Sequence, residues 1–147
     1  MSICLNNIGD ILFELGRLDE AFSFQKEALG ICESIDNIKG IGYVLNSLGN
    51  IYSMTGDIAN AEKQLLNSLE IREMMDNELN TAITLGNLSL VFMQKSEYEK
   101  AIQLAKQSLT IREAINDHHG IGIIKNIMAN ICINMNELDN AEIYINE

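Results

Sequence analysis

The feature that most constrains this chain is a repeat of 40 residues. At this spacing a large apolar residue, a small residue and a second large residue return in the same register, and an alanine follows further on. The aligned sets are Leu5, Leu45 and Leu85; Ile8, Leu48, Leu88 and Met128; Gly9, Gly49, Ser89 and Ala129; Leu12, Tyr52, Phe92 and Cys132; and Ala21, Ala61, Ala101 and Ala141. One such unit cannot bury its apolar faces alone, so the units must stack on one another.

Within a unit the apolar residues step by three and four, which is the period of an amphipathic helix. The first unit therefore predicts a helix over residues 3–15 and a second helix that reaches about residue 35. Gly16 and its equivalents Gly56, Ser96 and Asn136 should end the first helices. The pairs Asp36-Asn37, Asp76-Asn77 and Asn116-Asp117 should supply the turns and caps before the next unit. Each unit is thus predicted to be a helical hairpin, whose two helices approach closely at the small residues.

The pattern Leu-x-x-Leu/Ile-Gly-x-x-Tyr/Leu, followed by Ala and then Ala/Ser-Leu, resembles the tetratricopeptide repeat over the whole chain. The period of 40 exceeds the usual length of about 34, and Glu33, Glu73 and Glu113 stand where a proline is expected, so we expect longer helices. Repeats with Leu-Asn-Asn-Ile-Gly or Leu-Asn-Ser-Leu-Gly are similar to those of kinesin light chains, spindle-orientation adaptors and the sensor regions of bacterial regulators.

The resemblance implies an all-α fold, a right-handed α-solenoid of antiparallel helix pairs with about three and a half repeats. We expect one domain with units at about residues 2–41, 42–81, 82–121 and 122–147, the last of them incomplete. Met1 falls almost at the start of a helix and Glu147 falls inside the fourth second helix. These ends suggest a segment of a longer protein, or an open end that another subunit covers.

Composition and charge exclude several classes of function. The chain is 47% hydrophobic and 21% charged and has no proline, which predicts a folded protein. Its net charge of −11 opposes binding to nucleic acids and to anionic membranes. The uncharged stretches are too short to cross a bilayer, and a secretion signal is not apparent. Cys4, Cys32 and Cys132 have apolar neighbours and are interpreted as reduced core residues, so we expect a cytoplasmic protein.

The residues that could suggest a metal site or a phosphate loop do not have the neighbours or the secondary structure that such sites need. The adjacent His118 and His119 fall in a predicted turn, and no set of cysteines or carboxylates completes a metal site around them. The Gly40-x-Gly42 and Gly120-x-Gly122 pairs open helices instead of following strands, so they do not predict a phosphate loop. The sequence therefore predicts no enzyme activity, no cofactor and no metal.

The resemblance places a concave groove on the first helix of each repeat. The groove positions it implies are Asn6, Asn7, Asp10, Phe13, Tyr43, Asn46, Asn50, Met54, Ile83, Asn87, Leu90, Met93, Asn126, Asn130 and Ile133. Asparagine recurs among them although it costs a helix about 0.5 kcal/mol relative to alanine. A ladder of carboxamides would grip the backbone of an extended peptide; the alternative is a general bias of the chain toward asparagine.

The expected function is to bind a protein or peptide, as an extended or helical segment, within a signalling or regulatory protein. The groove is polar in the first units and apolar in the last, which favours a neutral to basic or amphipathic partner. A carboxylate clamp of the co-chaperone type is disfavoured, because Lys125 is the only basic residue expected nearby. The alternatives are self-association through the uncapped ends, and a regulatory arm of an enzyme whose catalytic domain lies outside this chain.

Overall fold

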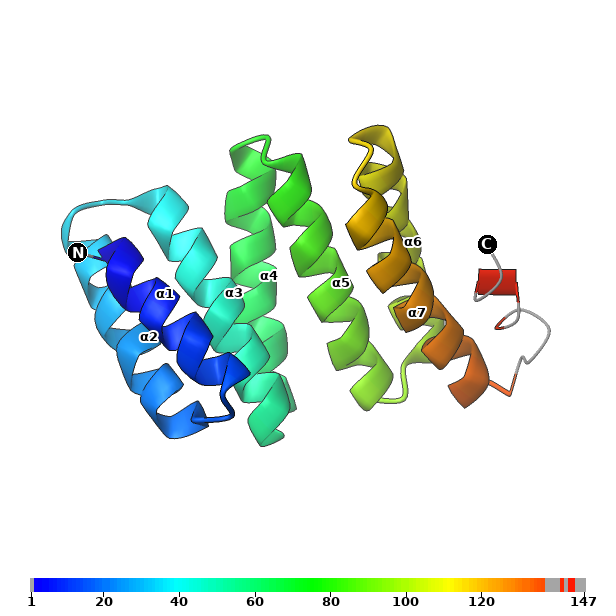
Figure 1. Cartoon of the computed structure of the whole chain (residues 1–147), viewed down its shortest axis with the longest axis horizontal. Helices are drawn as coiled ribbons and strands as arrows, with labels where there is room; N and C mark the ends of the chain where they lie inside the picture. The colour runs from blue at the N-terminus through cyan, green and yellow to red at the C-terminus, as the bar shows by residue number, and fades with distance from the viewer. Residues whose placement is uncertain (1, 137–140, 142, 145–147) are drawn as a thin grey trace. The chain divides into compact units, whose positions relative to one another are not determined.

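The structure, a computed structural model, describes residues 2–136, 141, 143 and 144. This part of the chain contains helices and turns and no strand. The helices are α1 (Ser2–Glu14), α2 (Leu18–Ser34), α3 (Ile38–Thr55), α4 (Ile58–Met74), α5 (Glu78–Gln94), α6 (Tyr98–Ala114) and α7 (His118–Asn134), shown in Figure 1. The predicted all-α helical repeat fold is confirmed. Met1 and Glu147, on which the expected open ends depend, lie outside the described residues.

The turns form as the sequence predicts. The residues that end the first helices have positive φ angles, 74° at Gly16 and 82° at Gly56, which is the left-handed conformation that stops a helix. Before α3 the side chain of Asn37 accepts a hydrogen bond from the backbone N–H of Gly40, and Asp57 caps α4 in the same way. The same types of helix-ending and helix-capping residues therefore define successive hairpins along the chain.

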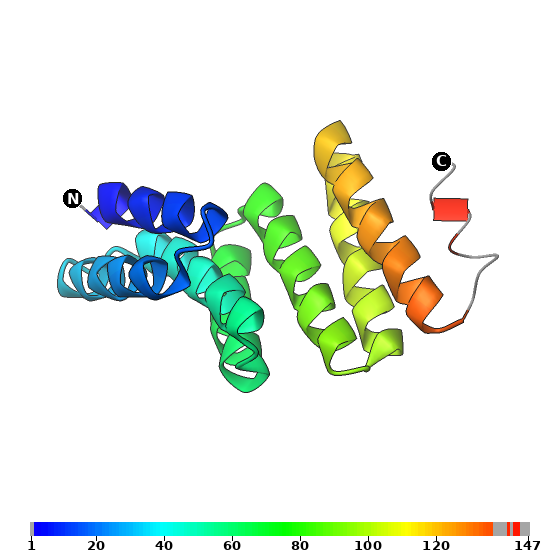
Figure 2. The ribbon, with the colours of Figure 1, turned by 60° about the horizontal axis from the view of Figure 1, so that its bottom comes forward.

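The chain divides into two compact units, Met1–Asp76 and Asn77–Glu147, which we call the N-terminal unit and the C-terminal unit. In the N-terminal unit α1 packs against α2, α2 against α3, α3 against α4, and α1 against α3. In the C-terminal unit α6 packs against both α5 and α7, and α5 also touches α7. Figure 2 shows the antiparallel course of α5 and α6 beside α7. The grouping of all repeats into one domain stays a prediction.

The small residues form the seam between paired helices. A Cβ atom added at Gly49 would lie only 2.6 Å from Leu65 Cγ, so a larger residue would push α3 away from α4. Ala21, Ala61 and Ala101 are fully buried on the second helices. Next to this seam Val44, Leu48, Ala28 and Cys32 make a core cluster with Leu5 of α1. The C-terminal unit buries Leu88, the counterpart of Leu48, together with Val91 and Phe92.

Candidate binding site on the first helices of the repeats

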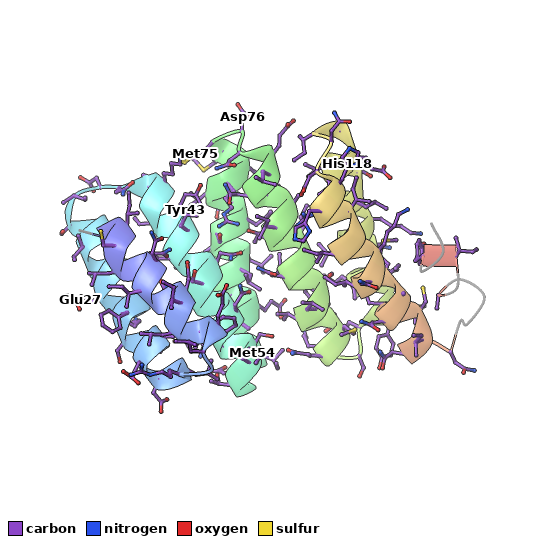
Figure 3. The ribbon with its side chains drawn as sticks, viewed as in Figure 1. Glu27, Tyr43, Met54, Met75, Asp76 and His118 are labelled. Carbon is purple, nitrogen blue, oxygen red and sulfur yellow. The ribbon has the colours of Figure 1, made fainter. Side chains whose placement is uncertain are left out.

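The N-terminal unit contains a cavity of about 360 Å³ between α1 and α3, which we call the α1–α3 cavity. Its apolar lining includes Ile3 and Val44, and Tyr43 adds an aromatic ring. The polar lining comes from both helices and from the turn before α3. The lining residues are Ile3, Asn6, Asn7, Cys32, Asn37, Lys39, Gly40, Tyr43 and Val44. Figure 3 marks Tyr43 near the beginning of α3 and Met54 near its other end, away from this cavity.

The C-terminal unit contains a matching cavity of about 370 Å³ between α5 and α7, the α5–α7 cavity. Its lining residues are Leu79, Ile83, Gly86, Asn87, Arg112, Asp117, His119, Ile123, Ile124 and Ile127. Every residue that lines the α1–α3 cavity, except Gly40, has its counterpart two repeats later in this lining. The 40-residue repeat thus builds the same hollow twice, and the side chains that line it differ.

The two cavities differ in chemistry. Tyr43 of the α1–α3 cavity is replaced by Ile123, and Asn6 is replaced by Gly86. At the end of the second helix, Cys32 is replaced by Arg112, whose Nη1 lies 2.6 Å from Asp117 Oδ2. The α5–α7 cavity is therefore mainly aliphatic with one neutralised ion pair, whereas the α1–α3 cavity has an aromatic and carboxamide lining.

Both cavities carry a basic residue in the same register, Lys39 in one and His119 in the other. Arg112 adds a second basic group to the α5–α7 cavity. The expectation that Lys125 would be the only basic residue near the groove is therefore wrong. The expectation considered only the groove positions further along the first helices, whereas Lys39 and His119 lie in the first turns of α3 and α7, and Arg112 lies at the end of α6.

Several predicted groove residues come together in the N-terminal unit. Asn6, Asn7 and Tyr43 line the α1–α3 cavity. Asp10 lies one turn beyond Asn6 and binds it, with Asn6 Nδ2 2.9 Å from Asp10 Oδ2. Burial raises the pKa of Asp10 above 3.8, and the hydrogen bonds from Ser47, Asn6 and Gln25 oppose that rise only in part.

Other predicted residues of this unit have internal contacts. Asn46 is buried and its Oδ1 accepts a hydrogen bond from Arg72 Nη1 at 3.4 Å. The Arg72 guanidinium also lies 5.4 Å from the centre of the Tyr43 ring. Burial lowers the pKa of Arg72 to about 10. Phe13 packs on the core cluster of Leu12, Ala21 and Ile51. These contacts give Asn46 and Phe13 a role in packing.

In the C-terminal unit Ile83 and Asn87 line the α5–α7 cavity, and the remaining predicted residues do not. Asn126, Asn130 and Ile133 are exposed on α7, and Leu90 and Met93 are half-buried on α5. In the N-terminal unit Asn50 is half-buried and Met54 is exposed, and both lie outside the α1–α3 cavity. The role of the asparagine ladder stays a prediction.

Sequence reasoning missed the lining residues that come from outside the first helices' groove faces, such as Cys32, Asn37, Lys39 and Asp117. The signal that could have found them is the repeat itself, because these positions recur 80 residues apart in both linings. Cys32 and Cys132 are buried as expected, but Cys4 is exposed, so its assignment to the core is wrong. Cys4 lies on the outer face of α1, which no other described helix covers.

The helical hairpins, their shared small-residue seam and the paired cavities define an α-helical repeat protein of the tetratricopeptide type. The sequence profile of the tetratricopeptide repeat family matches residues 1–74 and 40–114, so the chain belongs to this family. No curated protein sequence matches it significantly. No helix among the described residues is both long and apolar enough to span a membrane.

Solved structures share the fold. BtubC (BKLC) from P. vanneervenii superposes with a TM-score of 0.83 at 19% identity, over 99% of this chain and 60% of that one. A putative kinesin light chain with nearly identical TPR-like repeats from Podosopora anserina superposes with a TM-score of 0.77 at 11% identity, over 97% of this chain and 71% of the other. A single-residue variant of that protein gives 0.76 at 12% identity, over 97% and 70% of the two chains. This chain therefore spans only part of the length of these proteins.

Tetratricopeptide repeats generally serve as scaffolds that bind other proteins, and proteins built from them are typically not catalytic. This general role is what family membership establishes for the chain.

Proposed function

We propose that this chain binds a neutral to basic or amphipathic segment of another protein on the first helices of its repeats, within a cytoplasmic signalling or regulatory protein. The observation that supports this most directly is the pair of cavities in equivalent register, each of about the same volume. Each is large enough for a bulky side chain and has polar groups at its edge, which is the usual composition of a recognition pocket. Each cavity would take one bulky side chain of a partner.

The groove residues proposed to contact the partner are those that line or adjoin the cavities. Asn7 is exposed at the α1–α3 cavity, and Asn87 is half-buried at the same position of the α5–α7 cavity. A carboxamide can both donate and accept hydrogen bonds, so it can hold the backbone of an extended segment whatever its side chains are. Packed helices hold both cavities in place before binding, which lowers the cost of ordering the complex.

A random peptide library displayed on phage tests this proposal, with affinities of the selected peptides measured by fluorescence anisotropy. Gly86→Leu should fill the α5–α7 cavity and weaken binding about tenfold, because a Cβ atom at Gly86 already reaches Ile124 Cδ1 at 3.5 Å. The matched control is Gly122→Leu, since nothing lies within 4 Å of a Cβ atom at Gly122. Asn7→Leu and the exposed Asn67→Leu make the corresponding pair for the N-terminal unit.

Circular dichroism should show the same helical content for all four variants. If no peptide is selected, or if Gly86→Leu and Asn7→Leu bind as well as their controls, the cavities are not the binding site.

A second candidate function, self-association, is supported by one specific observation. Ile8 and Ile11 of α1 are 41% and 57% exposed, whereas Leu48 and Ile51 at the same register are each 2% exposed beneath the preceding hairpin. With Cys4 and Leu15 they form an apolar stripe without ionisable groups other than the thiol. Light scattering over a range of concentrations tests it: wild type should associate and the Ile8→Glu, Ile11→Glu double variant should stay monomeric. A wild-type chain that is monomeric throughout excludes this candidate.

A further inference from the structure

A cluster of hydrogen-bond donors converges on Asp10 from three helices of the N-terminal unit. Gln25 Nε2 of α2 lies 2.8 Å from Asp10 Oδ1, and Ser47 Oγ of α3 lies 2.7 Å from the same oxygen. Asn6 Nδ2 of α1 donates to Asp10 Oδ2 at 2.9 Å. Asp10 itself is only half-buried. The cluster of Asn6, Asp10, Gln25 and Ser47 is called the Asp10 cluster below.

Two oxygen atoms of the Asp10 cluster accept no hydrogen bond. Gln25 is completely buried, and its amide head is held against Asp10, yet its Oε1 accepts no hydrogen bond. The Oδ1 atom of Asn6 is also buried and also accepts none. Buried oxygens of this kind normally find a donor, because leaving them unsatisfied is unfavourable. Two such atoms beside one carboxylate indicate that a donor belongs in this place.

The charge at this place points to a cationic donor. Glu14 lies one turn beyond Asp10 on α1, and its negative charge adds to the burial that raises the pKa of Asp10. A raised pKa means that the Asp10 charge is poorly compensated by its surroundings. The chain as a whole carries a charge of −11, which attracts cations to its surface.

The feature is specific to the N-terminal unit. The positions of the Asp10 cluster, two repeats later, are Gly86, Leu90, Ala105 and Ile127. All four polar residues are thus replaced together by residues that neither carry charge nor form side-chain hydrogen bonds. The cluster therefore does not follow from the repeat pattern that the two units share.

We propose that the Asp10 cluster is a subsite for a lysine ammonium group carried by the partner protein. This rests on the proposed binding function and adds the chemistry of one anchor. An ammonium group donates three hydrogen bonds from a compact centre, which suits the Asp10 carboxylate and the two unsatisfied oxygens of Asn6 and Gln25. The aliphatic stem of the lysine would lie along the groove beside Asn6, which also lines the α1–α3 cavity.

The test uses n-butylammonium chloride as the probe and nuclear magnetic resonance as the readout, at constant ionic strength. The side-chain amide resonances of Asn6 and Gln25 should shift and saturate, and the pKa of Asp10 should fall, because a bound cation stabilises the carboxylate. Tetramethylammonium is the control probe: it has the same charge but no N–H group, so it should cause neither effect.

Two variants complete the test. Asp10→Asn, which places in the first repeat the residue found at Asn50, should abolish the shifts. The matched control Asp36→Asn removes the same charge at an exposed turn of the same unit, where Asn116 is the counterpart, and it should keep them. Equal shifts with tetramethylammonium, shifts that survive in Asp10→Asn, or the absence of saturable shifts in wild type would each overturn the proposal; the last would mean that water alone satisfies the cluster.

A peptide-binding experiment separates a failure of the ammonium subsite from a failure of the proposed binding function. For a library-selected peptide with a lysine, replacement by norleucine should weaken binding to wild type about fivefold or more and leave binding to Asp10→Asn unchanged. If selected peptides bind in the cavities but show no such lysine dependence, the ammonium subsite is wrong and the binding function stands.

Discussion

Arg112 Nη1 lies 2.6 Å from Asp117 Oδ2, and this ion pair joins the end of α6 to the residue that caps α7. The other carboxylate oxygen, Asp117 Oδ1, accepts the backbone N–H of Gly120 at 2.9 Å. One carboxylate therefore fixes the start of α7 and neutralises a buried guanidinium. Arg112 and Asp117 both line the α5–α7 cavity, so the stability of this turn and the form of the cavity are linked.

Gly120→Ala should destabilise the protein by about 1–2 kcal/mol, because a Cβ atom there would overlap the guanidinium of Arg112 and the carboxylate of Asp117. Gly122→Ala, on the same helix with nothing nearby, should instead stabilise it by about 0.5–1 kcal/mol by favouring the helix. Urea unfolding measures both. A Gly120→Ala variant as stable as wild type would show that the ion pair moves aside without cost.

Asp117 and Asp10 should titrate on opposite sides of pH 3.8. The hydrogen bond from Gly120, aided by Arg112, lowers the pKa of Asp117, so the stability it contributes is present above about pH 3.8 and is lost as the pH falls through its folded pKa. Burial raises the pKa of Asp10, so its protonation favours folding, and stability rises as the pH falls through that raised value. Carboxyl carbon resonances measure both titrations. Finding Asp117 to titrate above Asp10 would contradict this assignment.

Identical substitutions at one register should have different effects in the first two repeats. Ile51→Ala should cost about 3 kcal/mol, because Ile51 is 2% exposed in the core cluster with Leu12 and Ala21. Ile11→Ala should cost less than about 1 kcal/mol, because Ile11 is 57% exposed. Unfolding of the two variants at low protein concentration provides the comparison. Equal costs would mean that the stripe on α1 is buried in solution.

The three thiols should react at very different rates. Cys4 is exposed, while Cys32 and Cys132 are 1% and 3% exposed. One equivalent of a chromogenic disulfide reagent should therefore react quickly with the native protein, and two more only after unfolding. Cys4→Ser should remove the fast reaction and leave the slow one unchanged. Rapid modification of a second thiol in Cys4→Ser would contradict the packing around Cys32 or Cys132.

Much of the fold follows from periodicity along the chain. Hairpins, their turns and the seam at Gly49 and Ala61 could be predicted because each depends on residues close together in sequence. The cavity positions Asn7 and Tyr43 followed from the resemblance to the tetratricopeptide repeat. The contributions of Lys39 and Arg112 did not, because Lys39 lies in the first turn of α3, before the expected groove positions, and Arg112 lies at the end of a second helix.

The sequence by itself determined that the chain is a helical repeat of the tetratricopeptide family, because local spacing alone specifies amphipathic hairpins with small residues where they touch. Only the tertiary structure decided which groove residues are available to a partner. Asn6 and Asn46 have the same repeat position, yet Asn6 binds Asp10 and Asn46 binds Arg72. Asn6 donates to a residue of its own helix, whereas Asn46 accepts from Arg72 on α4, and contact between helices is a property of packing that a single repeat does not carry.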